Sequence, residues 1–372
     1  MELDYLCIDI ETYNVGSKPS PYTDNILMVS YVTADTAGVI VGGDWPDWLL
    51  GMLRDDKVLK IIQNSSFEAM FILHNYGIKI RNVWDTLAVE RLLVAGDNIS
   101  CALVDIVRRR LGKFLDKSLR DVISTGVIDE KTKQYCLDDS LVLFPIYEQQ
   151  QKEIRSRNQE YVVELECLMS VMSGEIEYHG IGFDKKLWRS YVPILEKKRR
   201  DAERKVWDFL GFSYCDNLFG ESTGALSLTC GSKVLEALSK KGIKLNDYKS
   251  ETLQEYFYRN PGSLKGRIVS TILDYKRWDK ALGWNYPKYI EPKTGRIHSS
   301  FNSQGTATFR FSSSKPNLQQ VVKPYEDINF RHLFVASPGK VFVGGDYSQI
   351  ELRILADLTG EQHYIDSFTK GT

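Results

Sequence analysis

The chain has 372 residues, a formal net charge of −1, 43% hydrophobic residues and 26% charged residues. This length allows two or three domains with separate cores, and the near-neutral charge gives no overall signature of a nucleic-acid-binding protein. The six cysteines stand singly without a CxxC pair, which argues against a zinc site or a disulfide framework. No run of about 18 apolar residues occurs, so we expect a cytoplasmic protein with no membrane partner.

The first predicted element is a strand over residues 4–13. It would place Ile8 and Ile10 on a buried face and Asp9 and Glu11 on the other. Residues two apart on a strand lie roughly 7 Å apart along it, so both carboxylates could reach metal ions held about 4 Å apart. The same pattern also fits a solvated strand face, so partners further along the chain must decide.

Three more strands are predicted over residues 26–32, 38–41 and 58–62, and a helix follows from Ser65. Strands that then alternate with helices predict a mixed sheet covered by helices. Glu68 lies in the first turn of that helix. Because Ser65-x-x-Glu68 is a capping-box pattern, Glu68 either caps the helix or binds a metal ion.

Further helices carry the next polar groups. Asp85 stands where an N-cap belongs. The run Arg108-Arg109-Arg110 lies opposite an apolar stripe and is either a solvated helix face or a phosphate contact. Tyr135 and Asp139, four residues apart, share one helix face, so Asp139 can bind a metal while the phenol positions a water. Asp138 lies one step round the helix and is expected to be solvated.

In this order, Asp9-x-Glu11, Asn64-x-x-Phe67-Glu68 and Tyr135-x-x-x-Asp139 resemble the three exonuclease motifs of the DEDDy proofreading domain. The resemblance implies a ribonuclease H-like fold and two-metal hydrolysis of 3′-terminal DNA phosphodiesters, with two Mg²⁺ or Mn²⁺ ions per site. It further implies that Tyr135 orients the attacking water and that Asn64 and Phe67 contact DNA. The implied metal ligands are Asp9, Glu11, Glu68 and Asp139. The family commonly has Asp where this chain has Glu68.

The chain turns polar around residues 150–160, which predicts a domain boundary. A long amphipathic helix is then predicted to end near Gly180, with an apolar stripe formed by Tyr161, Leu165, Leu168, Met172 and Ile176. The charged helix over residues 196–205 is either a solvated face or a surface that follows a DNA backbone.

Two later segments resemble family A DNA polymerases. Residues 163–184 resemble the entry to the thumb, and residues 295–320 resemble a segment whose Arg and Gln side chains contact the primer–template. This resemblance assigns DNA contacts to Arg310 and Gln319. Phe309 replaces the usual Gly of that segment, and Gln320 replaces the usual Asn.

Residues 340–356 resemble polymerase motif A, a strand followed by a turn and a helix. The resemblance makes Asp346 a catalytic metal ligand and Tyr347 and Glu351 nucleotide contacts, with Glu351 beneath the incoming sugar. Ser348-x-x-Glu351 is also a capping-box pattern, so Glu351 can serve in both ways.

We therefore expect an α/β chain with three parts. These are a ribonuclease H-like 3′-5′ exonuclease domain with a mixed sheet (1–155), a mainly helical thumb (156–290) and a partial α+β palm (291–372). The expected function is that of a phage-like family A DNA polymerase with proofreading activity on single-stranded 3′ ends. Primer–template synthesis would need a second polypeptide that supplies the fingers and the rest of the palm. The alternatives are a catalytically silent, DNA-binding half of a split polymerase and an RNA-trimming nuclease, and the polymerase motifs argue against the latter.

Overall fold

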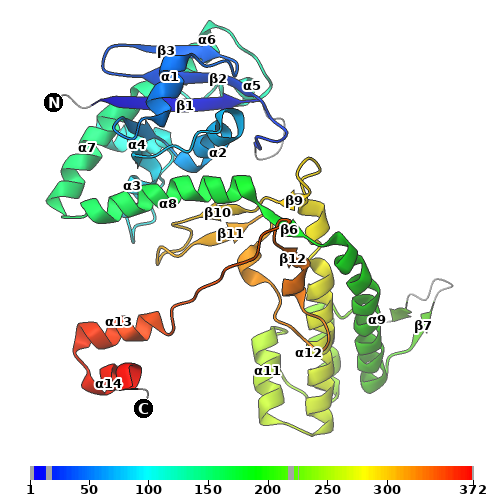
Figure 1. Ribbon diagram of the computed structural model, residues 1–372. Coiled ribbons are helices and arrows are strands. Elements are labelled where there is room, and N and C mark those ends of the chain that lie inside the picture. Colours follow the sequence, from blue (N-terminus) through cyan, green and yellow to red (C-terminus); the bar gives the residue numbers. More distant parts are fainter. Residues whose placement is uncertain (1–3, 14–18, 217–221, 225, 371–372) are drawn as a thin grey trace. The chain divides into compact units, whose positions relative to one another are not determined.

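The computed structural model describes residues 4–13, 19–216, 222–224 and 226–370 (Figure 1). It forms two compact units, residues 1–334 and residues 335–372, and each is described by itself. Among the described residues, no helix combines the length and the apolar character needed to cross a membrane.

The N-terminal part of the first unit is built on a five-stranded sheet of order β3-β2-β1-β4-β5. β1 is antiparallel to β2 and parallel to β4, so the expected mixed sheet is confirmed. The strands are β1 (Tyr5–Thr12), β2 (Ile26–Val32), β3 (Ala37–Val41), β4 (Leu59–Ile62) and β5 (Val83–Asp85).

Helices cover both faces of this sheet. Ile8 and Ile10 of β1 pack in a core with Leu49 of α1 and Phe71 of α2, while Cys7 faces a second core that contains Leu143 of α7. The alternation predicted for β1 is therefore present. The helices of this region are α1 (Asp47–Arg54), α2 (Ser65–Tyr76), α3 (Thr86–Leu93), α4 (Leu103–Leu111), α5 (Arg120–Ser124), α6 (Glu130–Leu141) and α7 (Leu143–Ser156).

Two arginines of the basic run are structural. Arg109 Nη2 lies 2.7 Å from Oε1 of Glu90, and Arg110 pairs with Glu90 and with Glu153. Glu90 is fully buried, so its charge needs such partners. These two residues therefore do not form a solvated face, and a phosphate contact by the run stays a prediction. Arg108 is solvated, with a side chain 66% exposed.

The rest of the first unit is mainly helical, as expected. α9 packs along α12, and their core contains Leu195, Trp207, Ile272 and Trp278. The helices are α8 (Glu160–His179), α9 (Lys185–Leu210), α10 (Gly231–Lys240), α11 (Ser250–Arg259) and α12 (Leu264–Gly283), with short 3₁₀ helices η1 (Tyr286–Tyr289), η2 (Leu318–Gln320) and η3 (Phe330–Leu333). The strands are β6 (Ile181–Phe183), β7 (Tyr214–Asp216), β8 (Ser222–Gly224), β9 (Arg296–Ile297), β10 (Ser300–Asn302), β11 (Ser312–Ser314) and β12 (Phe334–Val335).

α8 buries a different face from the one that its apolar stripe predicts. The stripe residues are 39% to 78% exposed, whereas Cys167, Ser170, Ser173 and Gly174 are buried. Small residues face α2 because the two helices lie very close there. A Cβ added at Gly174 would lie 2.2 Å from the Ser66 carbonyl oxygen. The predicted helix is correct, and its predicted buried face is wrong.

The second unit contains α13 (Ile350–Thr359) and α14 (Gln362–Lys370). The strand predicted over residues 340–345 is absent, and Val341 and Val343 are 82% and 93% exposed. A strand needs a neighbour to bond its backbone, and no described strand pairs with this segment. α13 begins after Gln349 in the left-handed conformation without a side-chain cap, so the capping box expected at Ser348 is not formed.

Candidate functional site

Three carboxylates from two elements meet at the sheet. Asp9 and Glu11 project from β1 and Asp139 from α6, and one ligand oxygen of each lies within 4.8 Å of the others. Among the described residues, this is the one group of three or more side chains placed to hold a metal ion. The buried hydroxyls of Ser30 on β2 and Ser140 on α6, 2.6 Å apart, tie the helix to the sheet next to Asp139. The predicted convergence of these three residues is therefore present.

Glu68, the fourth expected ligand, lies in the first turn of α2 outside this group of three, and its charge interacts with that of Asp9. Its side chain is 2% exposed, and burial followed by the nearby charge of Asp9 raises the pKa of Glu68 well above its usual value. Its Oε2 atom has no hydrogen-bond partner. A buried carboxylate oxygen without a donor is costly unless a proton or a cation satisfies it.

The capping role considered for Glu68 belongs to Asp85. Oδ2 of Asp85 accepts hydrogen bonds from the Ser65 backbone N–H at 2.7 Å and from the Ser65 hydroxyl at 2.8 Å. Oδ1 accepts from the N–H groups of Asn64, Leu87 and Ala88, so one carboxylate caps both α2 and α3. Asp85 is thus the predicted N-cap of α3 and also serves α2. Because the Ser65 N–H is taken, the capping box is not formed and Glu68 is left to face the cluster.

The charges of the cluster favour a cation. Burial and the neighbouring carboxylates raise the pKa of Asp9 well above its usual value, and burial followed by the charge of Asp139 raises the pKa of Glu11 to about 7. Oδ1 of Asp139, like Oε2 of Glu68, has no hydrogen-bond partner although it is buried. Oxygen donors that repel one another in this way suit a hard divalent cation. The residues present therefore fit a metal site.

Tyr135 lies beside the cluster on α6, one turn before Asp139. The residue is 6% exposed. Burial, followed by the charge of Asp139, raises the pKa of its phenol above the usual value. The phenol therefore stays neutral and can donate a hydrogen bond at neutral pH.

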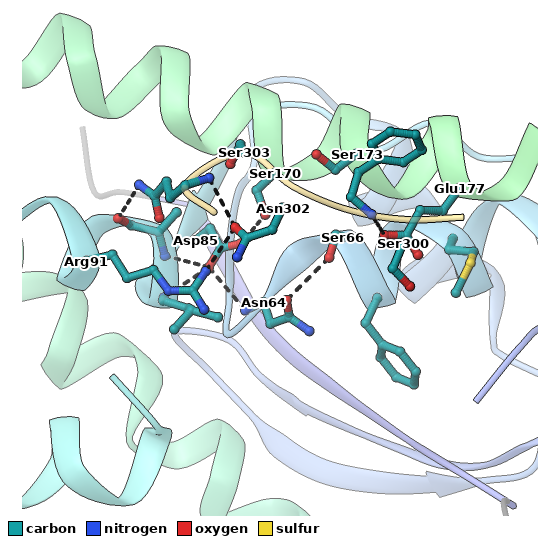
Figure 2. A pocket seen from close by; sticks show the side chains of 16 residues that line it. Asn64, Ser66, Asp85, Arg91, Ser170, Ser173, Glu177, Ser300, Asn302 and Ser303 are labelled. Atoms are coloured by element: carbon teal, nitrogen blue, oxygen red, sulfur yellow. Dashed lines mark hydrogen bonds between the residues drawn. The ribbon is translucent and has the colours of Figure 1, made fainter. Parts of the chain in front are cut away.

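The two residues expected to contact a DNA end, Asn64 and Phe67, line a pocket of about 220 Å³ (Figure 2). Asn64 is in the left-handed conformation with φ 70°, which turns the chain into α2. The far wall comes from Ser300–Gln304, a segment more than 200 residues away in sequence. Arg91 Nη1 donates a hydrogen bond to Oδ1 of Asn302 at 3.3 Å. The sequence analysis did not single out either of these two residues.

The residues expected at a polymerase site lie outside the carboxylate cluster. Arg310 and Gln319 are exposed in the first unit, and Nε2 of Gln319 donates to the Phe311 carbonyl at 2.9 Å. Phe309, where the family usually has Gly, has φ 57°. Glycine adopts this conformation without the steric cost that a side chain brings, which explains the usual preference. In the second unit, Asp346, Tyr347 and Glu351 are all exposed.

Comparisons with known proteins agree with this geometry. A 3′-5′ exonuclease family model matches residues 2–155, which contain the carboxylate cluster, and a DNA polymerase family A model matches residues 230–372. The chain is thus similar to DNA polymerase family A in its C-terminal part and to 3′-5′ exonucleases in its N-terminal part. Similarity to these families implies the use of divalent metal ions, and the acidic cluster lies within the segment that matches the exonuclease model.

Individual relatives extend the match. DNA polymerase I of Chloroflexus aurantiacus is 31% identical over 331 residues, 84% of this chain and 34% of that protein. DNA polymerase I of Rhizobium leguminosarum is 26% identical over 352 residues, 87% of this chain and 32% of that protein. The chain thus spans about a third of the length of these relatives. The solved POL domain of Pol1 from M. smegmatis, in complex with DNA primer-template and dNTP, has a TM-score of 0.75 and 20% identity, and the match covers 100% of this chain and 61% of that one.

Proposed function

We propose that the chain hydrolyses 3′-terminal phosphodiesters of DNA by a two-metal mechanism. The observation that carries the proposal is the convergence of Asp9, Glu11 and Asp139 within 4.8 Å, inside the segment that matches the exonuclease family model. Charge interactions of Glu68 with Asp9 and of Tyr135 with Asp139 support roles for both residues, although Glu68 lies outside the group of three. The Glu68 side chain is longer than the family's usual Asp, and its unpartnered Oε2 atom supports a role as a ligand.

In this mechanism, two Mg²⁺ or Mn²⁺ ions would be held by Asp9, Glu11, Glu68 and Asp139. When bound, the ions supply the charge that activates the attacking water and stabilises the leaving oxygen. The neutral phenol of Tyr135 donates a hydrogen bond that orients the water. The water would lose a proton to solvent as its oxygen bonds to phosphorus. The bond to the 3′ oxygen of the preceding nucleotide would break, that oxygen would take a proton from solvent, and a 5′-mononucleotide would be released.

The pocket beside α2 supports the placement of the DNA end. Asn64 and Phe67 line it from the segment that also carries Glu68 in the first turn of α2. The four carboxylates themselves do not line this pocket. Phe67 offers a ring on which a base can stack, and base stacking of this kind contributes about 1–3 kcal/mol per base.

The test is degradation of a 5′-labelled single-stranded DNA by the purified chain with Mg²⁺ or Mn²⁺. We expect a ladder of products shortened from the 3′ end and little cleavage of the same sequence as RNA. No shortening of DNA under either metal would leave the chain as a DNA-binding part of a polymerase, and faster cleavage of the RNA would indicate an RNA-trimming enzyme.

We also propose the three-part division at 1–155, 156–290 and 291–372, with Arg310 and Gln319 as primer–template contacts. In the palm part, Asp346 would hold a catalytic metal and Tyr347 and Glu351 would contact the incoming nucleotide. The close match of residues 340–356 to motif A supports these roles.

We further propose that DNA synthesis needs a second polypeptide that covers the exposed apolar surface of the second unit. Apolar residues of the second unit support this, because Val341, Val343 and Leu358 are each at least 79% exposed. Exposed apolar groups of this kind mark surfaces that a partner covers. The test is extension of a primed DNA template by the Asp9→Ala protein, in which proofreading cannot mask synthesis. Incorporation of even one nucleotide without a second polypeptide would refute the requirement.

A further inference from the structure

Lys117 is a cation in direct contact with Asp139 of the carboxylate cluster, and none of the three motifs of the exonuclease resemblance contains it. Its ammonium group pairs with Oδ2 of Asp139 and lies 4.8 Å from the centre of the Tyr135 ring. The Lys117 side chain is 30% exposed, whereas that of Asp139 is 6% exposed. The Lys117 side chain is therefore more accessible to solvent than that of Asp139.

The chain holds Lys117 at this place from both sides. Leu115, two residues earlier, is 6% exposed in a core with Ile106 and Ile146. Leu119, two residues later, packs against the core that contains Tyr135. Between these anchors, the backbone N–H of Ser118 donates to Oδ1 of Asp116 at 2.8 Å. The lysine is thus carried by a fixed turn, although its own stem is flexible.

The positive charge of Lys117 offsets part of the negative charge of the carboxylates. Up to four negative charges come together at Asp9, Glu11, Glu68 and Asp139. Burial raises the pKa of Asp9 and Glu11, and the positive charges of Lys117 and Arg120 oppose this rise. An ammonium on Asp139 therefore stabilises the cluster while no metal is bound. A divalent ion at Asp139 would compete with it for the same oxygens, because like charges repel.

We propose that Lys117 alternates between Asp139 and the substrate: it neutralises Asp139 in the metal-free site, and once metal ions occupy the carboxylates it binds a non-bridging oxygen of the terminal phosphate. This inference rests on the proposed exonuclease function. The phosphate role follows from position, because the displaced ammonium stays beside Tyr135, the residue that orients the water. A flexible stem with a compact charge suits such a transfer.

The experiment compares Lys117→Met, which keeps the stem and removes the charge, with Lys117→Arg and with the control Lys113→Met. Lys113 is an exposed lysine of the same loop. Binding of Mn²⁺ is measured by calorimetry, and turnover of single-stranded DNA is measured at saturating Mn²⁺. We expect Lys117→Met to bind Mn²⁺ about fivefold to tenfold more tightly, which corresponds to about 1–1.4 kcal/mol. Its turnover should fall about a hundredfold, as when one stabilising group of a transition state is removed.

The other variants keep the result interpretable. Lys113→Met should match the unmodified protein in both measurements, and Lys117→Arg should keep the weaker Mn²⁺ binding because it keeps the charge. Unchanged Mn²⁺ affinity in Lys117→Met would overturn the proposal, and so would tighter binding with unchanged turnover. If the unmodified chain cleaves no DNA, the proposed function fails, whereas the Mn²⁺ affinities still show whether Lys117 competes with metal at Asp139.

Discussion

Asp9 and Asp346 both follow an apolar run that the sequence predicts as a strand, yet their surroundings differ. Asp9 lies in β1 between two paired strands, and its charge interacts with those of Glu11, Asp139 and Glu68. Asp346 lies in an exposed segment without strand pairing and belongs to no group of three metal-ligating side chains among the described residues. The comparison shows that a motif provides the side chains of a site, whereas packing from distant segments provides its rigidity and its electrostatics.

The largest expected effect is the difference in exonuclease rate between Asp9→Ala and Asp346→Ala. Asp9→Ala should lower the exonuclease rate by more than about a thousandfold, because activation of the water and stabilisation of the leaving oxygen both depend on the metal ions. Its metal-free melting temperature should not fall, since removal of one carboxylate relieves repulsion in the cluster. Asp346→Ala should leave the exonuclease rate within about twofold, as for independent sites. Full nuclease activity in purified Asp9→Ala protein would refute the assignment.

Glu68 provides the next largest effect. Glu68→Gln should slow metal-dependent cleavage by about a hundredfold, because the amide cannot supply the charge that holds the ions. The melting temperature should be nearly unchanged, since Asp85 caps α2 in its place. The matched control is Asp138→Asn, which removes a carboxylate one helix step from Asp139. A large loss of stability with little loss of rate in Glu68→Gln would show that its role is structural after all.

The close contact between α8 and α2 predicts a loss of stability. Gly174→Ala should destabilise the chain by about 1–3 kcal/mol, because the added methyl meets the Ser66 carbonyl oxygen in a packed interface. Gly283→Ala in α12 is the control, since a Cβ there meets nothing within 4 Å and alanine favours the helix. Urea denaturation of both variants compares the effects. Equal midpoints would mean that the two helices separate easily.

The smallest expected effect is the pH dependence of the metal-free protein. Burial raises the folded-state pKa of Glu11 to about 7, above its unfolded value, so the folded protein holds more protons between about pH 4.5 and 7. Stability is therefore greatest at the acidic end of this window and falls as the pH rises through 7. We expect the metal-free melting temperature to be roughly 2–4 °C lower at pH 8 than at pH 5.5. Glu11→Gln should flatten this difference, and a metal-free protein that is more stable at pH 8 would contradict the expectation.

The sequence predicts those side chains of the site whose spacing follows the repeat of a single strand or a single helix. The two-residue spacing of Asp9 and Glu11 and the four-residue spacing of Tyr135 and Asp139 each depend on a single element, and both pairs lie as predicted. Contacts between segments distant in sequence have no such signal. The position of Lys117 beside Asp139 depends on how the loop before α5 folds back onto α6, which no periodicity records.

Two sequence predictions, the buried face of α8 and the strand before Asp346, are wrong for a similar reason. Large apolar residues usually indicate the buried face of a helix, but α8 buries small residues because it lies so close to α2. The apolar run over residues 340–345 has strand character, but a strand also requires a neighbour for its backbone. In both cases the deciding factor is another element, so the sequence of the segment alone was insufficient.

The hydrogen bonds of Asp85 predict which helices unfold together in a local opening of the chain. Its carboxylate accepts hydrogen bonds from the start of α2, from the start of α3 and, at 2.6 Å, from the Ser170 hydroxyl of α8. Because one buried side chain joins three helices, they lose these bonds together in any fluctuation that exposes it. We therefore expect the amides near Ser65 and Leu87 to exchange hydrogen with solvent in a single cooperative event that also frees α8. By this criterion, α8 belongs to the local unfolding unit of the exonuclease domain, although the polar stretch around residues 150–160 precedes it.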